Sequence, residues 1–390
     1  MIRLLAGAES SGATLLEAID ALGPARIAAL LTSEVAFRAR LSDLSLRLVA
    51  PLGIVLEFLH GGRSFATIVE IGPDGVRLCE ELEGDRPETV LTQDLEEAVR
   101  TVYGPRDLVS VASQVVRWPE VAVMASGGMA GQGLPSAYYP FVQRVLRSLS
   151  RREPADLAEL AAECGTDKWS ALHRYPEHYD RHFGSLRERR LTVLEIGVGG
   201  FGDPGAGAES LRMWKHYFPR AILYGLDIED KREFDELRIV TVRGDQSDPV
   251  SLAAFAEDVG PFDIVIDDGS HVSADVITSF RTLFSHVRPN GLYVIEDLQT
   301  SYWKPMFGGD DSDLTDPQYT MGFLKTLLDG LHHEEFLRAE AWEPQPTDGQ
   351  IRGVHFYHNL CFIEKGPNVE GGLFAETLRL WGTRGKSSSG

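Results

Sequence analysis

Blocks of apolar residues alternate with mixed polar blocks along the C-terminal part of the chain. Runs rich in β-branched and aliphatic residues, each about the length of one strand, cover residues 191–196, 221–226, 239–242, 262–266 and 291–295. Helices are expected over residues 208–218 and from Ser273 onward, and strands that alternate with helices predict an α/β fold with a parallel sheet. A final strand is predicted over residues 354–365, and its ending in Lys365-Gly-Pro indicates an edge strand.

The N-terminal third also mixes helical and strand patterns. Apolar residues at three- and four-residue spacing predict amphipathic helices over residues 14–22 and 34–47, and another helix is expected over 94–103. Strands are expected at residues 54–59 and 64–71, followed by Gly-Pro-Asp-Gly turn chemistry. We find no nucleotide-binding loop or catalytic cluster here. The pattern therefore predicts an α/β auxiliary or oligomerisation domain, and the alternative is a domain whose loop caps an active site in its own or a neighbouring subunit.

A glycine-rich segment at residues 126–135 separates this region from the rest of the chain. Glycine at that density is typical of a linker or a mobile lid. A helical stretch is then predicted over residues 139–162. We expect four parts, which are an auxiliary domain (1–130), a linker with a helical approach (131–160), a larger domain (161–384) and a tail outside the fold (385–390).

Composition places the chain among globular proteins and excludes some partners. Of its 390 residues, 43% are apolar and 25% are charged, with 38 basic against 58 acidic side chains and a net charge of −20. Such a surface repels phosphate backbones, and the apolar runs are too short to span a membrane, so neither nucleic acid nor membrane is expected as a partner. The N-terminus does not have the pattern of a signal peptide. Three widely spaced cysteines, Cys79, Cys164 and Cys361, are typical of reduced thiols in the cytoplasm.

Two of the predicted strands end in acidic side chains. Residues 262–267 run into Asp267, Asp268 and, after a tight turn, His271, while residues 291–295 run into Glu296 and Asp297. Because parallel strands open onto one crevice at their carboxyl ends, these groups are expected to converge there. Carboxylates with an adjacent imidazole indicate a divalent metal ion and a base.

Other interpretations of the acidic residues stay open. Asp268 before Gly-Ser has the pattern of a cap for the helix that starts near Ser273. For Asp267 a structural role and a contact with a cofactor are both open, and metal binding is the less favoured role.

Three further strand ends indicate a nucleotide site. The strand at 191–196 contains Glu195 and closes on Gly197 and Gly199, where glycine lets the backbone turn sharply and approach a ligand. The next strand ends in Asp227, whose carboxylate is placed to accept two ribose hydroxyl bonds. Asp245 and Gln246, after the third strand, suit an adenine edge. The glycine motif alone is weak evidence, since several nucleotide-binding families share it.

Taken together, the strand-end residues resemble class I S-adenosylmethionine-dependent methyltransferases, and the missing third glycine argues against a dinucleotide-binding dehydrogenase. The motifs at residues 165–168, 194–200, 225–228, 244–248, 266–271 and 294–298 further resemble the macrolide sugar O-methyltransferases of the mycinamicin VI 2''-O-methyltransferase type. This motif resemblance covers about residues 164–366. It implies a Rossmann-like methyltransferase domain beside the N-terminal auxiliary domain, and a homotetramer.

The resemblance also implies roles for the individual residues. Magnesium would be bound by Asp268, Glu296 and Asp297, and His271 would be the general base. S-adenosylmethionine would contact Glu195, Gly197, Gly199, Asp227, Asp245, Gln246 and Asp267. The expected reaction is methylation of a deoxysugar hydroxyl, for example on rhamnose or deoxyallose, in a macrolide or polyketide.

This chemistry suits a sugar diol. A hydroxyl is a poor nucleophile near neutral pH, so a hard cation that chelates two vicinal hydroxyls, together with a histidine of pKa ~6.5, lowers the cost of removing its proton. The alternatives are another diol such as a catechol, for which the base is usually a lysine, and a non-catalytic S-adenosylmethionine-binding module.

Several aromatic and histidine residues remain without a firm role. His173, His178 and His182 have spacings of five and four, and amphipathic packing is favoured for them over a metal site. The resemblance to the methyltransferases also makes a contact with the methionine end of the cofactor attractive for this segment. The aromatic loop at residues 302–307 indicates a wall for a large apolar ligand. His355 and His358 are expected to be structural.

Overall fold

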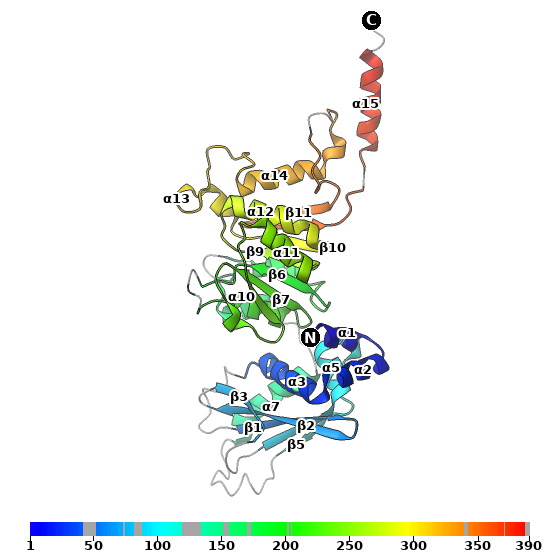
Figure 1. Cartoon of the computed structure of the whole chain (residues 1–390), viewed down its shortest axis with the longest axis vertical. Helices are drawn as coiled ribbons and strands as arrows, with labels where there is room; N and C mark the ends of the chain where they lie inside the picture. The colour runs from blue at the N-terminus through cyan, green and yellow to red at the C-terminus, as the bar shows by residue number, and fades with distance from the viewer. Residues whose placement is uncertain are drawn as a thin grey trace. The chain divides into compact units, whose positions relative to one another are not determined.

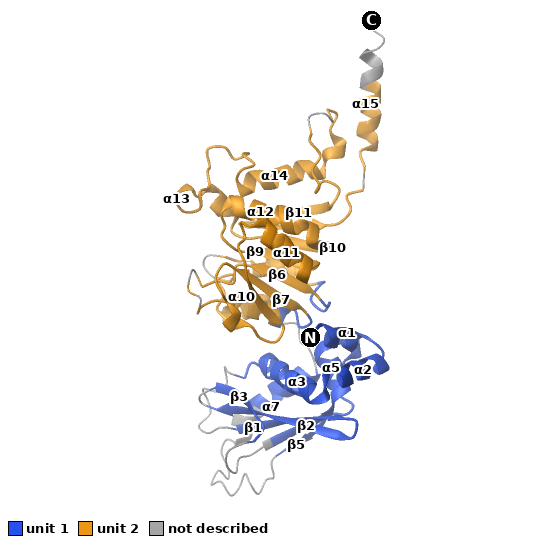
Figure 2. Ribbon diagram, viewed as in Figure 1, with its two compact units in different colours: residues 1–156, 185–190, 216–220 blue, residues 157–184, 191–215, 221–390 orange. Residues whose placement is uncertain are grey.

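The computed structural model describes residues 1–41, 52–72, 75–81, 88–118, 134–150, 156–169, 173–200, 203, 205–338, 342–369 and 371–386. These residues form two compact units (Figures 1 and 2), of which the first contains residues 1–156, 185–190 and 216–220 and the second the remainder. The domain boundaries predicted at residues 130 and 160 remain predictions. Most of the glycine-rich segment, residues 126–133, lies outside the described residues.

The first unit is a mixed five-stranded sheet with helices packed on it. Its strands occur in the order β3-β2-β1-β4-β5, with β1 parallel to β4 and the other pairs antiparallel. The strands are β1 (Leu52–His60), β2 (Arg63–Gly72), β3 (Gly75–Cys79), β4 (Glu88–Asp94) and β5 (Val115–Arg117). The helices are α1 (Ile2–Glu9), α2 (Gly12–Leu22), α3 (Pro24–Ala39), α5 (Leu95–Tyr103) and α7 (Leu134–Ser150), with the short η1 (Arg106–Leu108).

The second unit is built on a seven-stranded sheet in the order β11-β12-β10-β9-β6-β7-β8. All neighbouring strands are parallel except β12, which runs antiparallel to both β10 and β11. The strands are β6 (Thr192–Ile196), β7 (Ile222–Asp227), β8 (Ile239–Arg243), β9 (Phe262–Asp267), β10 (Val287–Ile295), β11 (Ile351–Tyr357) and β12 (Leu360–Lys365). The predicted parallel α/β sheet is therefore confirmed.

Helices and short 3-10 turns connect these strands. The helices are α8 (Leu157–Cys164), α9 (Pro176–Phe183), α10 (Glu209–Tyr217), α11 (Pro249–Val259), α12 (Ser273–Leu283), α13 (Lys304–Phe307), α14 (Thr320–Leu331) and α15 (Leu373–Lys386). The 3-10 turns are η2 (Arg232–Phe234), η3 (Phe284–His286), η4 (Leu298–Tyr302) and η5 (His333–Glu335).

Side-chain alternation along β12 shows that the sheet is covered on both faces. Cys361 and Ile363 belong to the core formed with α11, α12 and α14. Phe362 points the other way and packs against Tyr179 and Phe183 of α9, with ring centroids 5.3 and 5.9 Å away. Successive residues of a strand face opposite sides, so helices form a layer on each face of the sheet.

Two sequence predictions of secondary structure were wrong. Residues 354–365 form a hairpin of two strands, because Asn359 adopts φ +62° in the two-residue turn between Tyr357 and Leu360. The edge strand is consequently β11, and β12, which ends at Lys365, lies inside the sheet. Helix α3 begins about ten residues before the predicted start at residue 34, because Pro24 initiates it after Gly23.

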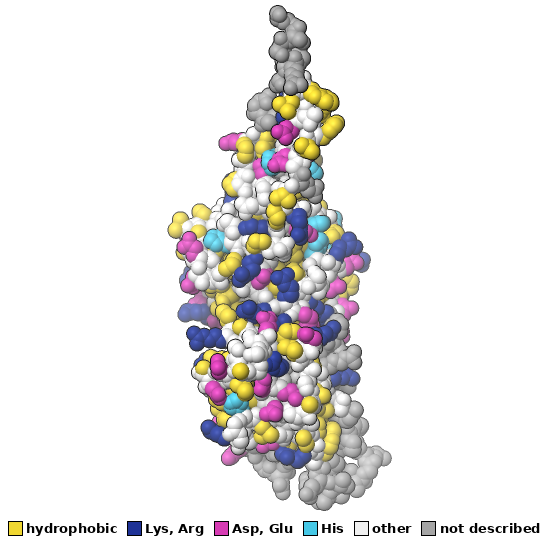
Figure 3. All heavy atoms as spheres, turned by 90° about the vertical axis from the view of Figure 1, so that its right-hand side faces the viewer, with side chains coloured by type: hydrophobic (Ala, Val, Ile, Leu, Met, Phe, Trp, Pro, Cys, Tyr) yellow, Lys and Arg dark blue, Asp and Glu magenta, His cyan; other side chains and the backbone are white. Residues whose placement is uncertain are grey.

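The described surface carries both signs of charge. Figure 3 shows acidic and basic side chains interspersed on the face drawn, and hydrophobic side chains gathered toward the C-terminal end. There α15 exposes Leu373, Phe374, Leu380 and Trp381. Among the described residues, no helix has the length and apolar content needed to cross a membrane.

Candidate active site

The acids predicted at two strand ends converge at the carboxyl edge of the sheet. Strands β9 and β10 are parallel neighbours, with Asp267 level with Ile295 of β10 and Ile196 of β6. Beyond these pairs, the Glu296 amide donates to the Asp267 carbonyl and the Asp268 amide donates to the Ile196 carbonyl, both at 3.0 Å. The ladder thus continues past the strands and fixes the backbone that carries both acids.

Asp268 lies at the centre of two overlapping groups of potential metal ligands. One ligand atom from each of Asp268, His271 and Asp297 lies within 4.8 Å of the others, and the same holds for Glu195, Asp268 and Glu296. The three predicted metal ligands are therefore distributed over two adjoining groups that share Asp268. The helix-cap interpretation of Asp268 is wrong, because Val272 occupies the N-cap position of α12.

Lys168 supplies the positive charge between the acids. Its ammonium group lies 2.7 Å from Asp268 Oδ2, 2.6 Å from Glu296 Oε1 and 3.4 Å from Glu195 Oε1, and the residue is 1% exposed. Burial disfavours its charged form, but the field of these acids outweighs burial and raises the pKa of Lys168 well above its usual value. Burial raises the pKa of Glu296, and the negative charge of Asp268 raises it further.

His271, the predicted base, is a member of the first group. Its Nε2 lies 3.7 Å from Asp297 Oδ2, and its side chain is 20% exposed. Both His271 (φ +57°) and Asp297 (φ +53°) adopt the left-handed conformation, which costs free energy for residues other than glycine and clusters at active sites. A partly exposed imidazole beside a carboxylate is suited to accept a proton from a bound hydroxyl.

The aromatic loop predicted to be a ligand wall lies beside this base. The ring centroids of Phe307 and His271 are 6.1 Å apart. The structure forms the short helix α13 here, and Trp303 at its N-cap and Met306 within it are 49% and 77% exposed, respectively. Apolar side chains left in solvent next to a polar site are typical of a surface that an apolar ligand covers.

Two tyrosines, Tyr175 just before α9 and Tyr179 within it, hold the acids through hydrogen bonds. Tyr175 donates a 2.8 Å hydrogen bond to Asp297 Oδ1, and Tyr179 donates to the Glu296 carboxylate. Burial raises the pKa of both phenols, so they remain protonated donors at neutral pH. His173 Nε2 lies 3.5 Å from Asp297 Oδ1, while its Nδ1 is a buried atom with no hydrogen-bond partner. The four-residue spacing of the tyrosines was the available signal, but the sequence did not show their partners.

The glycine loop after β6 folds back on the neighbouring strands. Gly197 has φ +89°, and a Cβ atom there would overlap the carbonyl oxygen of Asp268. Gly199 has φ +85°, and the amide of Val198 donates a 2.9 Å hydrogen bond to Asp227 Oδ2. The loop and the end of β7 are therefore joined, with glycine required where the backbones approach.

Of the remaining predicted cofactor residues, Asp245 is exposed, whereas Gln246 and Asp267 are buried and bonded to each other. Asp245 accepts hydrogen bonds from the amide and hydroxyl of Ser247. Gln246 is buried, donates a 2.6 Å bond to Asp267 Oδ1 and accepts from the Ser270 amide. Asp267 is 1% exposed and also accepts from Ser279 and Tyr293, and burial raises its pKa to about 6. The pair of Gln246 and Asp267 thus braces the loop that leads to His271.

Glu195 lies on the inner side of the acidic group. It is fully buried, and its carboxylate accepts hydrogen bonds from Ser210 at 2.9 Å and from the Trp214 indole at 3.2 Å. Burial raises the pKa of Glu195. The structure therefore places this predicted cofactor residue next to Lys168 and against helix α10.

The strand order, with its reversal between β6 and β9 and one antiparallel strand, defines the second unit as a Rossmann-like class I methyltransferase domain. The N-terminal domain family described as "MycE methyltransferase N-terminal" matches residues 1–114. The chain is 43% identical over 360 residues to the 8-demethyl-8-alpha-L-rhamnosyl tetracenomycin-C 2'-O-methyltransferase of Streptomyces olivaceus, covering 90% of this chain and 91% of that relative.

Two further comparisons agree. Mycinamicin VI 2''-O-methyltransferase of Micromonospora griseorubida is 51% identical over 235 residues, or 59% of this chain and 57% of that relative. The solved structure of MycE methyltransferase in complex with Mg, SAH and mycinamycin VI matches with a TM-score of 0.84 and 38% identity, covering 95% of this chain and 93% of that one. The chain belongs to the family of sugar O-methyltransferases of macrolide and polyketide pathways, as the motif resemblance predicted.

Proposed function

We propose that this chain transfers a methyl group from S-adenosylmethionine to a hydroxyl of a deoxysugar, such as rhamnose or deoxyallose, on a macrolide or other polyketide. The observation that carries the proposal is the position of Asp268. Its carboxylate belongs to both groups of potential metal ligands, and in one of them it lies within 4.8 Å of His271. The relatives support the substrate class, since their names specify methylation of a rhamnosyl tetracenomycin and of mycinamicin VI.

The donor set at the sheet edge fits a magnesium ion. Asp268, Glu296 and Asp297 offer carboxylate oxygens only, and magnesium prefers a small number of such ligands with positions left open. When bound, magnesium would supply a hard Lewis acid for vicinal hydroxyls and S-adenosylmethionine an activated methyl group. The chain holds the acids in place through Lys168 and Tyr175, whose contacts do not use every carboxylate oxygen.

His271 is proposed to remove the proton of the reacting hydroxyl. Its ring is partly exposed and lies on the turn beside Asp297, so its imidazolium form would be stabilised after proton transfer. Lys168 is unsuited to this role, because it is buried and the surrounding acids keep its ammonium group protonated. This argues against a catechol-type site with a lysine base.

We assign the cofactor to the crevice beyond β6 and β7. Gly197 and Gly199 would face its methionine part, with Glu195 behind them, and Asp227 would hold the ribose. Asp245 would lie beside the adenine, whereas Gln246 and Asp267 would shape that pocket from within. The buried, unpaired Nδ1 of His173 supports a polar ligand on the α9 side.

The proposal is tested by incubating the enzyme and S-adenosylmethionine with a panel of glycosylated macrolides and rhamnosylated polyketides. Mass spectrometry should show one added methylene, and fragmentation should place it on a sugar. Chelation should abolish turnover and magnesium should restore it. Methylation of the aglycone, or turnover indifferent to chelator, would contradict the substrate class or the metal site, respectively.

We further propose that the protein acts in the cytoplasm as a homo-oligomer, a tetramer by resemblance to its family. The family match over residues 1–114 supports an auxiliary role for the first unit. Light scattering of the full chain would measure the oligomeric state directly.

A further inference from the structure

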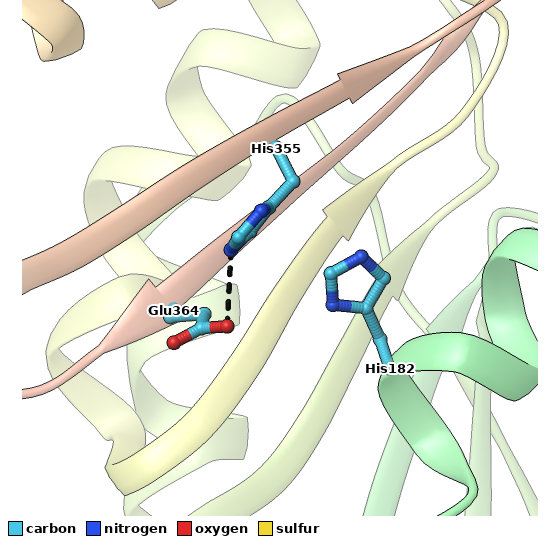
Figure 4. A group of neighbouring side chains, drawn as sticks. All are labelled: His182, His355 and Glu364. Atoms are coloured by element: carbon cyan, nitrogen blue, oxygen red, sulfur yellow. Dashed lines mark hydrogen bonds and ion pairs between the residues drawn. The ribbon is translucent and has the colours of Figure 1, made fainter.

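A second cluster of metal-binding side chains lies within the methyltransferase unit, apart from the acids described above. One ligand atom each from His182, His355 and Glu364 lies within 4.8 Å of the other two. Figure 4 shows the His182 ring, carried by a helix, facing the pair formed by His355 and Glu364 on two antiparallel strands. Glu364 pairs with Leu292 of β10, four residues before Glu296, so about 13 Å of strand separates the two sites.

Two of the three side chains already have nearly the geometry that a metal ion requires. His355 Nε2 lies 3.0 Å from Glu364 Oε1. Ligand distances of ~2.1 Å in a tetrahedral zinc site place neighbouring ligand atoms about 3.4 Å apart. His182, within 4.8 Å, therefore needs a side-chain movement of roughly an ångström to complete the set.

The surroundings orient each ligand. The Tyr357 hydroxyl lies 3.0 Å from His182 Nε2, which leaves Nδ1 to face the cluster, and the ring stacks on Phe362 with centroids 4.2 Å apart. Arg352 binds Glu364 Oε2 at 3.0 Å and leaves Oε1 for the cluster. A metal-binding histidine usually has its second nitrogen bonded in this way. Burial lowers the pKa of His182 to about 4, so its ring is in the neutral, metal-binding form at neutral pH.

We propose that His182, His355 and Glu364 form a binding site for a zinc-class divalent cation, distinct from the magnesium site. Two imidazoles and one carboxylate select zinc, cobalt or nickel over magnesium, which prefers oxygen ligands. The ion would join α9 to the β11–β12 hairpin. Because α9 also carries Tyr179, which donates to Glu296, occupancy would hold this helix against the active site.

The site is tested by titrating the metal-free full chain with Zn²⁺ in a calorimeter, with magnesium present in excess. The carboxylate site can also take zinc, so the measured quantity is the number of equivalents. His355→Gln and Glu364→Gln should each lose one equivalent or bind it at least about 100-fold more weakly, because outer-shell changes alone cost 10–100-fold. The matched control is His358→Gln, an exposed histidine of the same hairpin, which should keep the wild-type equivalents.

A second variant separates a site from a folding defect. Tyr357→Phe keeps the ring and removes only the hydroxyl that orients His182, and it should weaken this equivalent about 10-fold. Circular dichroism would verify that each variant is folded. Equal zinc equivalents and affinities in the wild type, His355→Gln, Glu364→Gln and Tyr357→Phe would overturn the proposal, as would zinc binding to the wild type only at millimolar concentrations. Neither readout depends on methyl transfer.

Discussion

Replacing Lys168 by methionine should destabilise the methyltransferase unit strongly, because this side chain is the shared cation of three buried or partly buried acids. At an effective dielectric constant of about 20, the 2.7 Å contact with Asp268 corresponds to roughly 6 kcal/mol of gross attraction. Desolvation of the ammonium offsets much of it. Removal of one partner from a buried ion pair costs about 3–5 kcal/mol, since the remaining charges lose their compensation. We expect Lys168→Met to fall within that range.

The measurement is chemical denaturation at neutral pH in the presence of a chelator. Lys231→Met is the matched control, because Lys231 is 2% exposed and donates to the backbone carbonyls of Asp203 and Ala206. It should cost about 1–3 kcal/mol, the penalty of unsatisfied carbonyls. Magnesium should restore part of the stability of Lys168→Met, since it brings positive charge to the same acids, and should not rescue Lys231→Met.

A double variant separates lost charge compensation from lost packing. In Lys168→Met combined with Glu296→Gln, the acid left unpaired is also neutralised, so at least about half of the lost stability should return. A loss of less than about 1 kcal/mol in the single variant would refute the reasoning. A double variant whose loss of stability exceeds the sum of the losses in the two single variants would also refute it.

Three further predictions concern the base, the glycine loop and the second cluster. His271→Ala should lower kcat about 10²–10⁴-fold, while calorimetry should show a nearly unchanged affinity for the cofactor. The control variant His286→Ala should leave kcat unchanged. Equal kcat values in the two variants would place the base elsewhere. Gly197→Ala should cost about 2 kcal/mol or more of stability in thermal unfolding, because it combines a positive φ with a backbone clash, while Gly349→Ala, which has open space, should cost little. Burial lowers the pKa of His182 from 6.5 in the unfolded chain to about 4 in the folded chain, so in chelator its contribution to the free energy of unfolding should be lost as the pH falls from 6.5 to 4. Over that range the wild type should lose about 1 kcal/mol more stability than His182→Gln, a value discounted for the half-exposed ring. Parallel pH profiles of the two proteins would contradict this.

The sheet and its strand ends were predictable because their information is local. Each central strand is a short apolar run, and the acids or glycines that follow it mark where it ends. Parallel pairing then brings Asp268 and Glu296 to one edge without any knowledge of packing. The hairpin at residues 357–360 was missed for a local reason, since its turn has Asn359 at positive φ without the usual glycine. Helix α15, whose apolar residues Leu373, Phe374, Leu380 and Trp381 are exposed, was not predicted either.

The contacts that hold the acids were not predictable in the same way. Lys168 precedes Asp268 by 100 residues and Glu296 by 128, and no periodicity around Lys168 connects it to either. What the sequence did contain was the spacing along α9, which puts Tyr175, Tyr179 and His182 within two turns of one helix. This spacing places the three side chains on one face, but the residues that they contact come from other strands.

Helix α9 therefore has a role that neither strand-end motif reveals. Tyr175 at its N-cap and Tyr179 within it donate hydrogen bonds to Asp297 and Glu296, and its last turn brings His182 to the β11–β12 hairpin. A shift of this helix would move both tyrosine hydroxyls away from the acids while leaving the strands in place. Because carboxylates so close together repel one another, their positions depend on these donors as well as on Lys168. The geometry of the candidate site is thus fixed by a helix remote from it in sequence, and only the three-dimensional arrangement connects the two.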